Sequence, residues 1–176
     1  MVETDCTEIR LAEKSKSTAG EKVKGQQIGI GGGAFMKQFG IQMIDNSISS
    51  QWWKTIMKYF VKIGNSFEIR CWKEEAAEIE SASLYGVAVD DKCEVSIKGS
   101  VTKELLEKLL IEEPTDKSIY NKMTKYFTIH VENDLCNIWS EHYGTEMVID
   151  VISDADIEFL EKVMSQYSES FSIRIS

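Results

Sequence analysis

Apolar and polar residues alternate along several short stretches of this chain, and elsewhere apolar residues recur with a period of about 3.6. Alternation is typical of strands with one buried face, and the longer period is typical of amphipathic helices. The alternation predicts strands over residues 67–72, 83–89, 93–98, 127–132, 136–141, 146–152 and 171–175. The helical period predicts helices over residues 50–63, 100–112 and 153–166, with a short one over 118–125. Residues 73–80 are predicted to form a charged break between two elements.

Most of the predicted strands are joined by connections of hairpin length, which favour antiparallel pairing. Strands that occur in groups between helices, rather than in alternation with them, indicate an α+β fold. We therefore expect a mixed, mainly antiparallel sheet with the helices packed on one of its faces; the alternative is two packed half-sheets. Four residues on the apolar faces of the predicted helices are expected to be buried: Leu106, Leu109, Leu160 and Val163.

Two parts of the chain resemble each other. Residues 67–71 and 127–131 share an apolar pattern at a spacing of 60 residues, and each segment leads to a Tyr-Gly pair. A second match, at a spacing of 54 residues, joins a strand-like and a helix-like pattern in the same order. We therefore predict an internal duplication of a strand-strand-strand-helix unit, with copies at about residues 67–112 and 127–166 and with Pro114 between them.

Length and composition fit one globular domain, since 176 residues of which 43% are apolar are enough to enclose one hydrophobic core. Residues 1–26 differ from the rest, because they are rich in Lys, Glu, Ser and Thr and carry five basic and five acidic side chains. We expect a polar N-terminal segment over residues 1–26 and a single α+β domain over residues 27–176 that contains the repeat. No run of 18 apolar residues occurs, so no membrane-spanning segment is predicted.

The cysteines bear on the compartment. Cys6, Cys71, Cys93 and Cys136 are scattered along the chain without close pairs. This spacing predicts free thiols in a reducing, cytoplasmic compartment, and it lacks the paired ligands of a structural zinc site. The N-terminus is acidic and without the apolar core of a secretory signal, which agrees with a cytoplasmic location. No cofactor and no metal ion are predicted.

Negative charge is concentrated in one part of the chain. The formal net charge is −9, and residues 132–169 hold ten acidic side chains against Lys162 alone, which is an excess of nine negative charges. Such a field repels the phosphates of nucleic acids and attracts basic protein surfaces. The alternative interpretation is a solvated face that keeps the protein soluble.

Aromatic residues lie close to these carboxylates in the sequence. Trp and Tyr bury a large area at an interface, while an acidic rim steers a basic partner towards it. The sequence therefore predicts a partner-binding surface that consists of Trp72, Asp134, Trp139, Glu141, His142 and Tyr143. The alternative is that the aromatic side chains lie in the core beneath the helices.

A small acidic α+β chain without a catalytic motif resembles, in size and composition, the immunity proteins of bacterial toxin systems and other stoichiometric inhibitors. This resemblance implies a binding module that neutralises a basic protein partner, such as a nuclease-like toxin. Two other hypotheses stand beside it. One is a small enzyme that uses the glycine-rich loop Gly29–Gly33 or the segment Trp139–Tyr143. The other is an adaptor that self-associates, for example as a homodimer, through a sheet edge. Neither a nucleic acid nor a membrane is predicted as a partner.

Overall fold

The computed structural model describes residues 37–45, 48–114, 121–133, 136–151 and 153–176. These residues belong to one compact unit, Phe35–Ser176. The predictions for residues 1–26, for the loop Gly29–Gly33 and for Asp134 lie outside the described residues.

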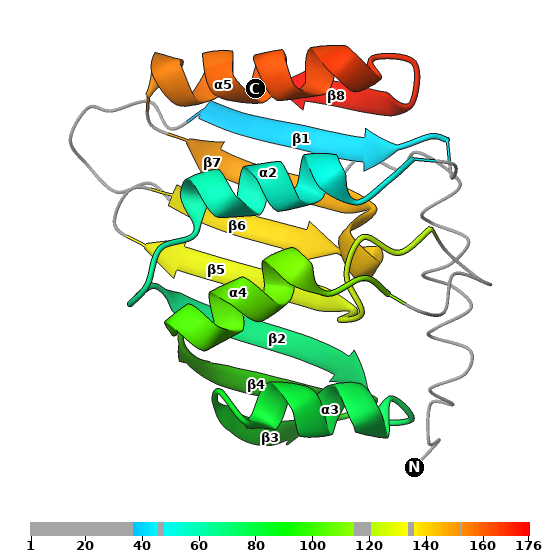
Figure 1. Ribbon diagram of the computed structural model, residues 1–176, viewed down its shortest axis with the longest axis vertical. Coiled ribbons are helices and arrows are strands. Elements are labelled where there is room, and N and C mark those ends of the chain that lie inside the picture. The colour runs from blue at the N-terminus through cyan, green and yellow to red at the C-terminus, as the bar shows by residue number, and fades with distance from the viewer. Residues whose placement is uncertain (1–36, 46–47, 115–120, 134–135, 152) are drawn as a thin grey trace. The chain divides into compact units, whose positions relative to one another are not determined.

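Eight strands form one open sheet in the order β3-β4-β2-β5-β6-β7-β1-β8 (Figure 1). Every pair of neighbouring strands is antiparallel, so the sheet is not mixed as predicted but uniformly antiparallel. The first strand along the chain, β1, therefore lies between the last two, β7 and β8. The strands are β1 (Lys37–Met43), β2 (Ser66–Trp72), β3 (Val87–Asp91), β4 (Glu94–Ser100), β5 (Thr128–Asn133), β6 (Cys136–Glu141), β7 (Glu146–Val151) and β8 (Phe171–Ile175).

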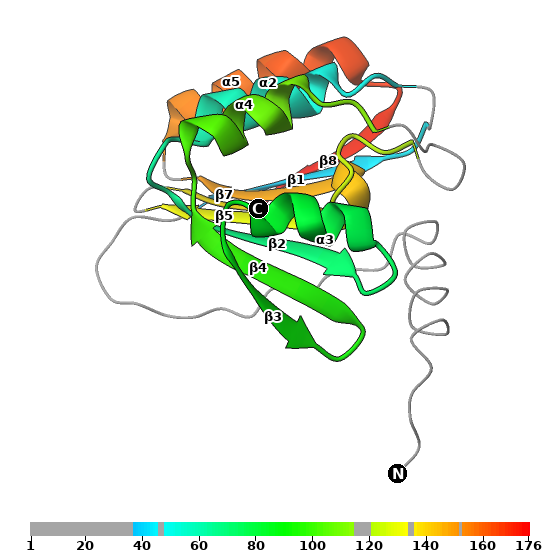
Figure 2. The same ribbon diagram turned by 60° about the horizontal axis from the view of Figure 1, so that its bottom comes forward.

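Four α-helices of the described residues lie on one face of this sheet, in front of it in Figure 1, which confirms the predicted arrangement. In Figure 2, α5, α2 and α4 run side by side above the strands. The rings of Tyr59 in α2 and Phe159 in α5 stack with centroids 3.7 Å apart. The helices are α2 (Gln51–Phe60), α3 (Ala76–Ser83), α4 (Lys103–Ile111) and α5 (Asp154–Met164), with short 3-10 turns at η1 (His142–Gly144) and η2 (Ser165–Tyr167).

Local sequence explains where two of the helices begin. The Thr102 hydroxyl accepts a hydrogen bond from the backbone N–H of Leu105 at the start of α4, and Ser153 does the same for Asp156 at the start of α5. Such caps satisfy N–H groups that have no partner within the helix.

The main core lies between the sheet and the helices. Leu109 and Leu160 are buried there, as predicted, whereas Leu106 and Val163 are only half-buried. The alternation of the strands directs one row of side chains from each towards the helices. Fully buried members of this core include Phe39, Trp52, Trp53, Ile56, Ile69, Ile97, Ile138, Ile149, Leu160 and Met164.

The predicted duplication is not found. In the first segment β2 pairs with β4, which gives the order β3-β4-β2, whereas β5, β6 and β7 follow one another as a simple meander. The first segment also contains α3, where the sequence predicted a charged break, and this helix separates β2 from β3 along the chain. The two segments therefore differ in topology, although each ends with a strand followed by a helix.

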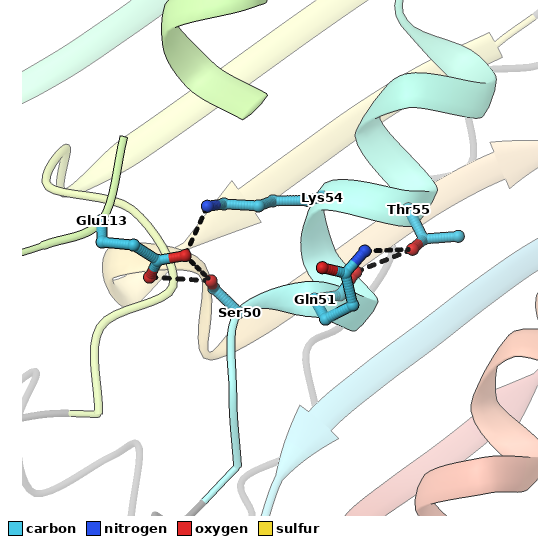
Figure 3. A network of polar contacts seen from close by, with 5 residues as sticks. All are labelled: Ser50, Gln51, Lys54, Thr55 and Glu113. Carbon is cyan, nitrogen blue, oxygen red and sulfur yellow. Dashed lines mark hydrogen bonds and ion pairs between the residues drawn. The ribbon is translucent and has the colours of Figure 1, made fainter. Parts of the chain in front are cut away.

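A polar network fixes the start of α2 (Figure 3). Ser50 is buried and donates to both carboxylate oxygens of Glu113, at 2.8 and 2.9 Å, and the Lys54 ammonium also binds this carboxylate. The first turn of α2 has no acidic residue of its own. Glu113, which follows α4, therefore supplies the negative charge that favours a helix N-terminus.

Glu113→Gln is expected to lower the free energy of unfolding by about 1 kcal/mol, because it removes the charge that faces a buried lysine. The Lys54 side chain is 10% exposed, but that of Glu113 is 56% exposed, so solvent screening keeps the loss small. The matched control is Glu107→Gln in the exposed Lys103–Glu107 pair, with an expected loss of no more than about 0.5 kcal/mol. Urea denaturation measures both values, and equal losses would show that the network contributes nothing specific.

Candidate protein-binding face

The sheet has a second face, which points away from the helices and which we call the open face. No helix of the described residues lies on it. Strand register places the side chains of β5, β6 and β7 on this face in rows that run across the strands. The central patch is defined as the open-face residues His130 and Glu132 of β5, Asn137, Trp139 and Glu141 of β6, and Glu146, Val148 and Asp150 of β7.

Trp139 lies in the middle of the central patch. Its cross-strand neighbours are His130 on one side and Val148 on the other. The indole stacks on the His130 imidazole, with centroids 3.7 Å apart and planes 10° from parallel. Trp139, His130 and Val148 are all half-buried, so each keeps part of its surface in contact with solvent. The stacking holds the indole in one orientation.

A row of hydrogen bonds crosses four strands beside this aromatic pair. His130 Nε2 donates to Asn137 Oδ1, and Asn137 Nδ2 donates to Asp150 Oδ2 at 3.4 Å. Gln38 in β1 donates to the other oxygen of Asp150 at 3.0 Å. The row links β5, β6, β7 and β1 and fixes the side chains around Trp139.

Charges on the open face differ between its two halves. On the β2–β4 side, Arg70 binds Asp91 at 2.9 Å and Glu94 at 2.7 Å, and Lys98 lies 3.6 Å from Glu68. Strands β5, β6 and β7 contain no lysine or arginine. They carry four carboxylates on the open face: Glu132, Glu141, Glu146 and Asp150. The central patch is therefore acidic. On the β2–β4 side, by contrast, the carboxylates of Glu68, Asp91 and Glu94 lie close to arginine or lysine side chains.

Glu68 shows how the basic side chains act on their half of the face. Burial by itself would raise the pKa of this carboxyl group. The hydroxyl of Ser96, which donates at 2.6 Å, and the charges of Lys98 and Arg70 outweigh that effect and hold the pKa of Glu68 below its ordinary value.

Two of the predicted partner-binding residues lie beneath the surface. Trp72 and Tyr143 are each only 1% exposed and pack on Phe127, with ring centroids 4.7 and 5.4 Å from it. The Tyr143 hydroxyl donates to Glu75 at 2.6 Å. Alternation along β2 placed Trp72 on the open face, but Phe127 packs against it there. Burial assigns these two residues to the support of the face, and a direct contact with a partner stays a prediction for Trp139, Glu141 and His142.

The turn between β6 and β7 has an unusual backbone. The φ angles are +50° at His142, +59° at Tyr143 and +82° at Gly144. These values lie in the left-handed region, which residues other than glycine seldom adopt. The Tyr143 carbonyl accepts hydrogen bonds from the backbone N–H groups of Met123 and Thr124, at 2.8 and 3.2 Å. These contacts hold the backbone of the turn in place.

The turn also gathers metal-ligating side chains. Glu141, His142 and Glu146 are half-buried, and one ligand atom from each lies within 4.8 Å of the other two. The sequence predicted no metal site. His142 and Glu146 are four residues apart, but a turn between two strands brings them together rather than a helix.

Two cysteine thiols in the described residues are expected to be unreactive. Cys71 and Cys136 are free and buried, and burial raises the pKa of both, that of Cys136 to about 12. They remain protonated at neutral pH and are therefore poor nucleophiles. The prediction of free thiols is confirmed at these two positions and does not hold for Cys93, which is disulfide-bonded. The cysteines therefore give no argument for a reducing compartment.

None of the described helices is both long enough and apolar enough to cross a lipid bilayer. No protein family model matches the chain, and neither a curated protein nor a solved structure matches it. The function has to be inferred from the residues of the chain itself.

Proposed function

We propose that the chain binds a basic protein partner through the central patch. The observation that carries the proposal is the position of Trp139 and Val148, half-buried in the middle of the open face with the carboxylates of β5, β6 and β7 around them. Aromatic anchors near the centre of an interface supply most of its binding energy, and charges around them speed up the encounter.

The order of the side chains on this face supports a protein as the ligand. Stacking on His130 holds Trp139, and the hydrogen bonds of Asn137 and Gln38 hold Asp150, so little conformational freedom is lost when a partner docks. Nucleic acid is a poor fit, because the phosphate backbone is repelled by the same carboxylates.

Trp139→Ala is expected to raise the dissociation rate about 30-fold, which corresponds to the roughly 2 kcal/mol of a hot-spot residue. The partner is first captured from an extract of the source organism, with the wild-type chain as bait, and is then purified for surface-immobilised kinetics. The matched control is Tyr59→Ala, which removes a partly exposed aromatic ring from α2 on the opposite face. Equal effects of the two changes would contradict binding through the open face.

Glu132→Lys is expected to slow association with the same partner by roughly threefold or more at low salt, because steering of charged partners is electrostatic. Glu132 is exposed on the open face, and Glu158→Lys in α5 makes the same charge change on the helix-covered side. A partner that proves acidic, or an association rate indifferent to salt and to Glu132→Lys, would contradict the proposal.

A narrower version of the proposal is that the basic partner is a toxin, for example a nuclease, and that the chain neutralises it. Size, acidic composition and the acidic central patch support this form. Its test is stoichiometric inhibition: one equivalent of the wild-type chain should abolish the activity of the captured partner, and the Trp139→Ala chain should require an excess.

A self-associating adaptor is the second candidate, and the outer edge of β8 favours it. Ile173 and Ile175 are 37% and 45% exposed on this edge strand, which has no acidic residue. The opposite edge strand, β3, ends in Asp90 and Asp91, and charged residues discourage pairing between edges. Sedimentation velocity decides between the candidates, since an adaptor is dimeric without any partner.

A further inference from the structure

Three metal-ligating side chains meet where β6 turns into β7. We propose that Glu141, His142 and Glu146 bind a divalent transition-metal ion, with Zn²⁺ as the representative ion. Their ligand atoms lie within 4.8 Å of one another, and the side chains of His142 and Glu146 are only 16% and 21% exposed. An imidazole nitrogen with two carboxylate oxygens is a donor set that suits zinc and its neighbours in the first transition row.

The distances fit one ion. Zinc ligands at about 2.0–2.1 Å in a tetrahedron are separated from one another by about 3.4 Å. His142 Nδ1 and Glu146 Oε2 are already 3.5 Å apart. All three ligand atoms lie within 4.8 Å of one another, so side-chain shifts on the order of 1 Å would bring them to the spacing of tetrahedral ligands. Three protein ligands leave one position of the tetrahedron for water or for a group from a partner.

Electrostatics favour a cation at this place. Glu141 and Glu146 are directly opposite each other on neighbouring strands and on the same face of the sheet. Two like charges in this position destabilise a sheet. Strands β6 and β7 themselves contain no lysine or arginine, and the lysine at this turn, Lys122, has its Nζ 4.1 Å from the ring centroid of Tyr143. A dication turns this repulsion into attraction.

Neighbouring groups orient the ligands. The ring of Phe127 lies edge-on to the His142 imidazole, with centroids 5.6 Å apart, and the left-handed turn fixes the backbone of His142. Gln42 Nε2 lies 3.5 Å from Glu146 Oε1, which leaves Oε2 directed at His142. Such outer contacts are a regular part of metal sites. Glu141 and His142 also have other contacts, with which the ion would compete.

The test is a calorimetric titration of the full chain with Zn²⁺ after dialysis against a chelator. We expect one ion per chain, and a dissociation constant raised at least about tenfold by either His142→Asn or Glu146→Gln, since even outer-sphere changes cost about 10–100-fold. Asparagine tolerates the left-handed backbone at position 142, and Glu146→Gln provides a second variant should that one fail to fold.

Glu132→Gln is the matched control, because it removes one negative charge from the same face without touching the three ligands. It should change the dissociation constant by less than about threefold, a difference of under about 0.7 kcal/mol. Substitution with Co²⁺ gives a second readout, because tetrahedral coordination produces strong visible absorption that both ligand variants should lose. Absence of 1:1 binding tighter than about 100 µM, or equal weakening by Glu132→Gln, would overturn the proposal.

The metal site shares Glu141 and Glu146 with the central patch, but the titration with Zn²⁺ needs no partner. Trp139→Ala should leave the Zn²⁺ affinity unchanged while it speeds dissociation of the partner, so failure of one proposal can be told from failure of the other.

Discussion

Leu160→Ala should lower the free energy of unfolding by roughly 2–5 kcal/mol, the range found when a large buried side chain is truncated. Leu160 is fully buried in α5, where it packs into the core between the helices and the sheet. Leucine and alanine both favour helices, so the loss reports lost packing and the cavity left behind, rather than a change in helix propensity.

Glu161→Ala is the control for Leu160→Ala. Glu161 is the next residue in α5 and is exposed, so its truncation should change stability by no more than about 0.5 kcal/mol. Urea or thermal denaturation of both variants gives the comparison. A loss below about 1 kcal/mol for Leu160→Ala would mean that α5 does not present this side chain to the core.

Gly144→Ala is the second change with a large expected effect, a loss of roughly 2–4 kcal/mol. About 1 kcal/mol comes from the backbone, because Gly144 has a φ angle of +82°. The remainder comes from packing, since an added Cβ would lie 2.8 Å from Met123 Cβ and 3.0 Å from Trp53 Nε1. Overpacking of this kind typically costs about 1–3 kcal/mol.

Gly64→Ala separates these two contributions. Gly64 has a similar φ angle, +91°, but nothing lies within 4 Å of an added Cβ. This control should therefore lose only the backbone contribution of about 1 kcal/mol. Equal losses at positions 64 and 144, measured by denaturation, would contradict the close packing around the turn.

Alternation and helical periodicity predicted most of the elements. The strands β2, β4, β5, β6, β7 and β8 and the helices α2, α4 and α5 lie within a few residues of their predicted bounds. In all of them except β8, of which only Phe171 is buried, one face meets the core, so the local pattern and the tertiary environment agree.

Elements with a weak or long-range signal were missed. Helix α3 presents only Ile79 and Ala82 to the core, and charged residues around them hid the helical period. Strand β1 alternates correctly, with Phe39, Ile41 and Met43 buried, but both of its neighbours in the sheet come from the far end of the chain. The predicted strand over residues 83–89 lies instead at Val87–Asp91, because α3 includes Ser83 and a turn over residues 84–86 follows it.

The candidate site could be predicted only in part, because it also depends on contacts between residues far apart in the sequence. Acidic residues near Trp139 could be recognised in the sequence, and the register brings several of them onto one face. Burial of Trp72 and Tyr143 depends on Phe127, which no local pattern connects with them. The approach of His142 to Glu146 depends on a left-handed turn, for which Gly144 is the one sequence signal.

The position of β1 has a consequence for how the protein is made. During translation, β1 leaves the ribosome about 100 residues before β7, its first partner in the sheet. At about 5–20 residues per second, roughly 5–20 s pass between the synthesis of β1 and that of β7. During this time the apolar side chains of β1 have no neighbouring strand: Phe39, Ile41 and Met43. Strand β8, its other neighbour, is made later still, within the last residues of the chain. The nascent chain thus carries an unpaired apolar strand for most of its synthesis, and translation pauses beyond β1 should promote aggregation more than pauses before it.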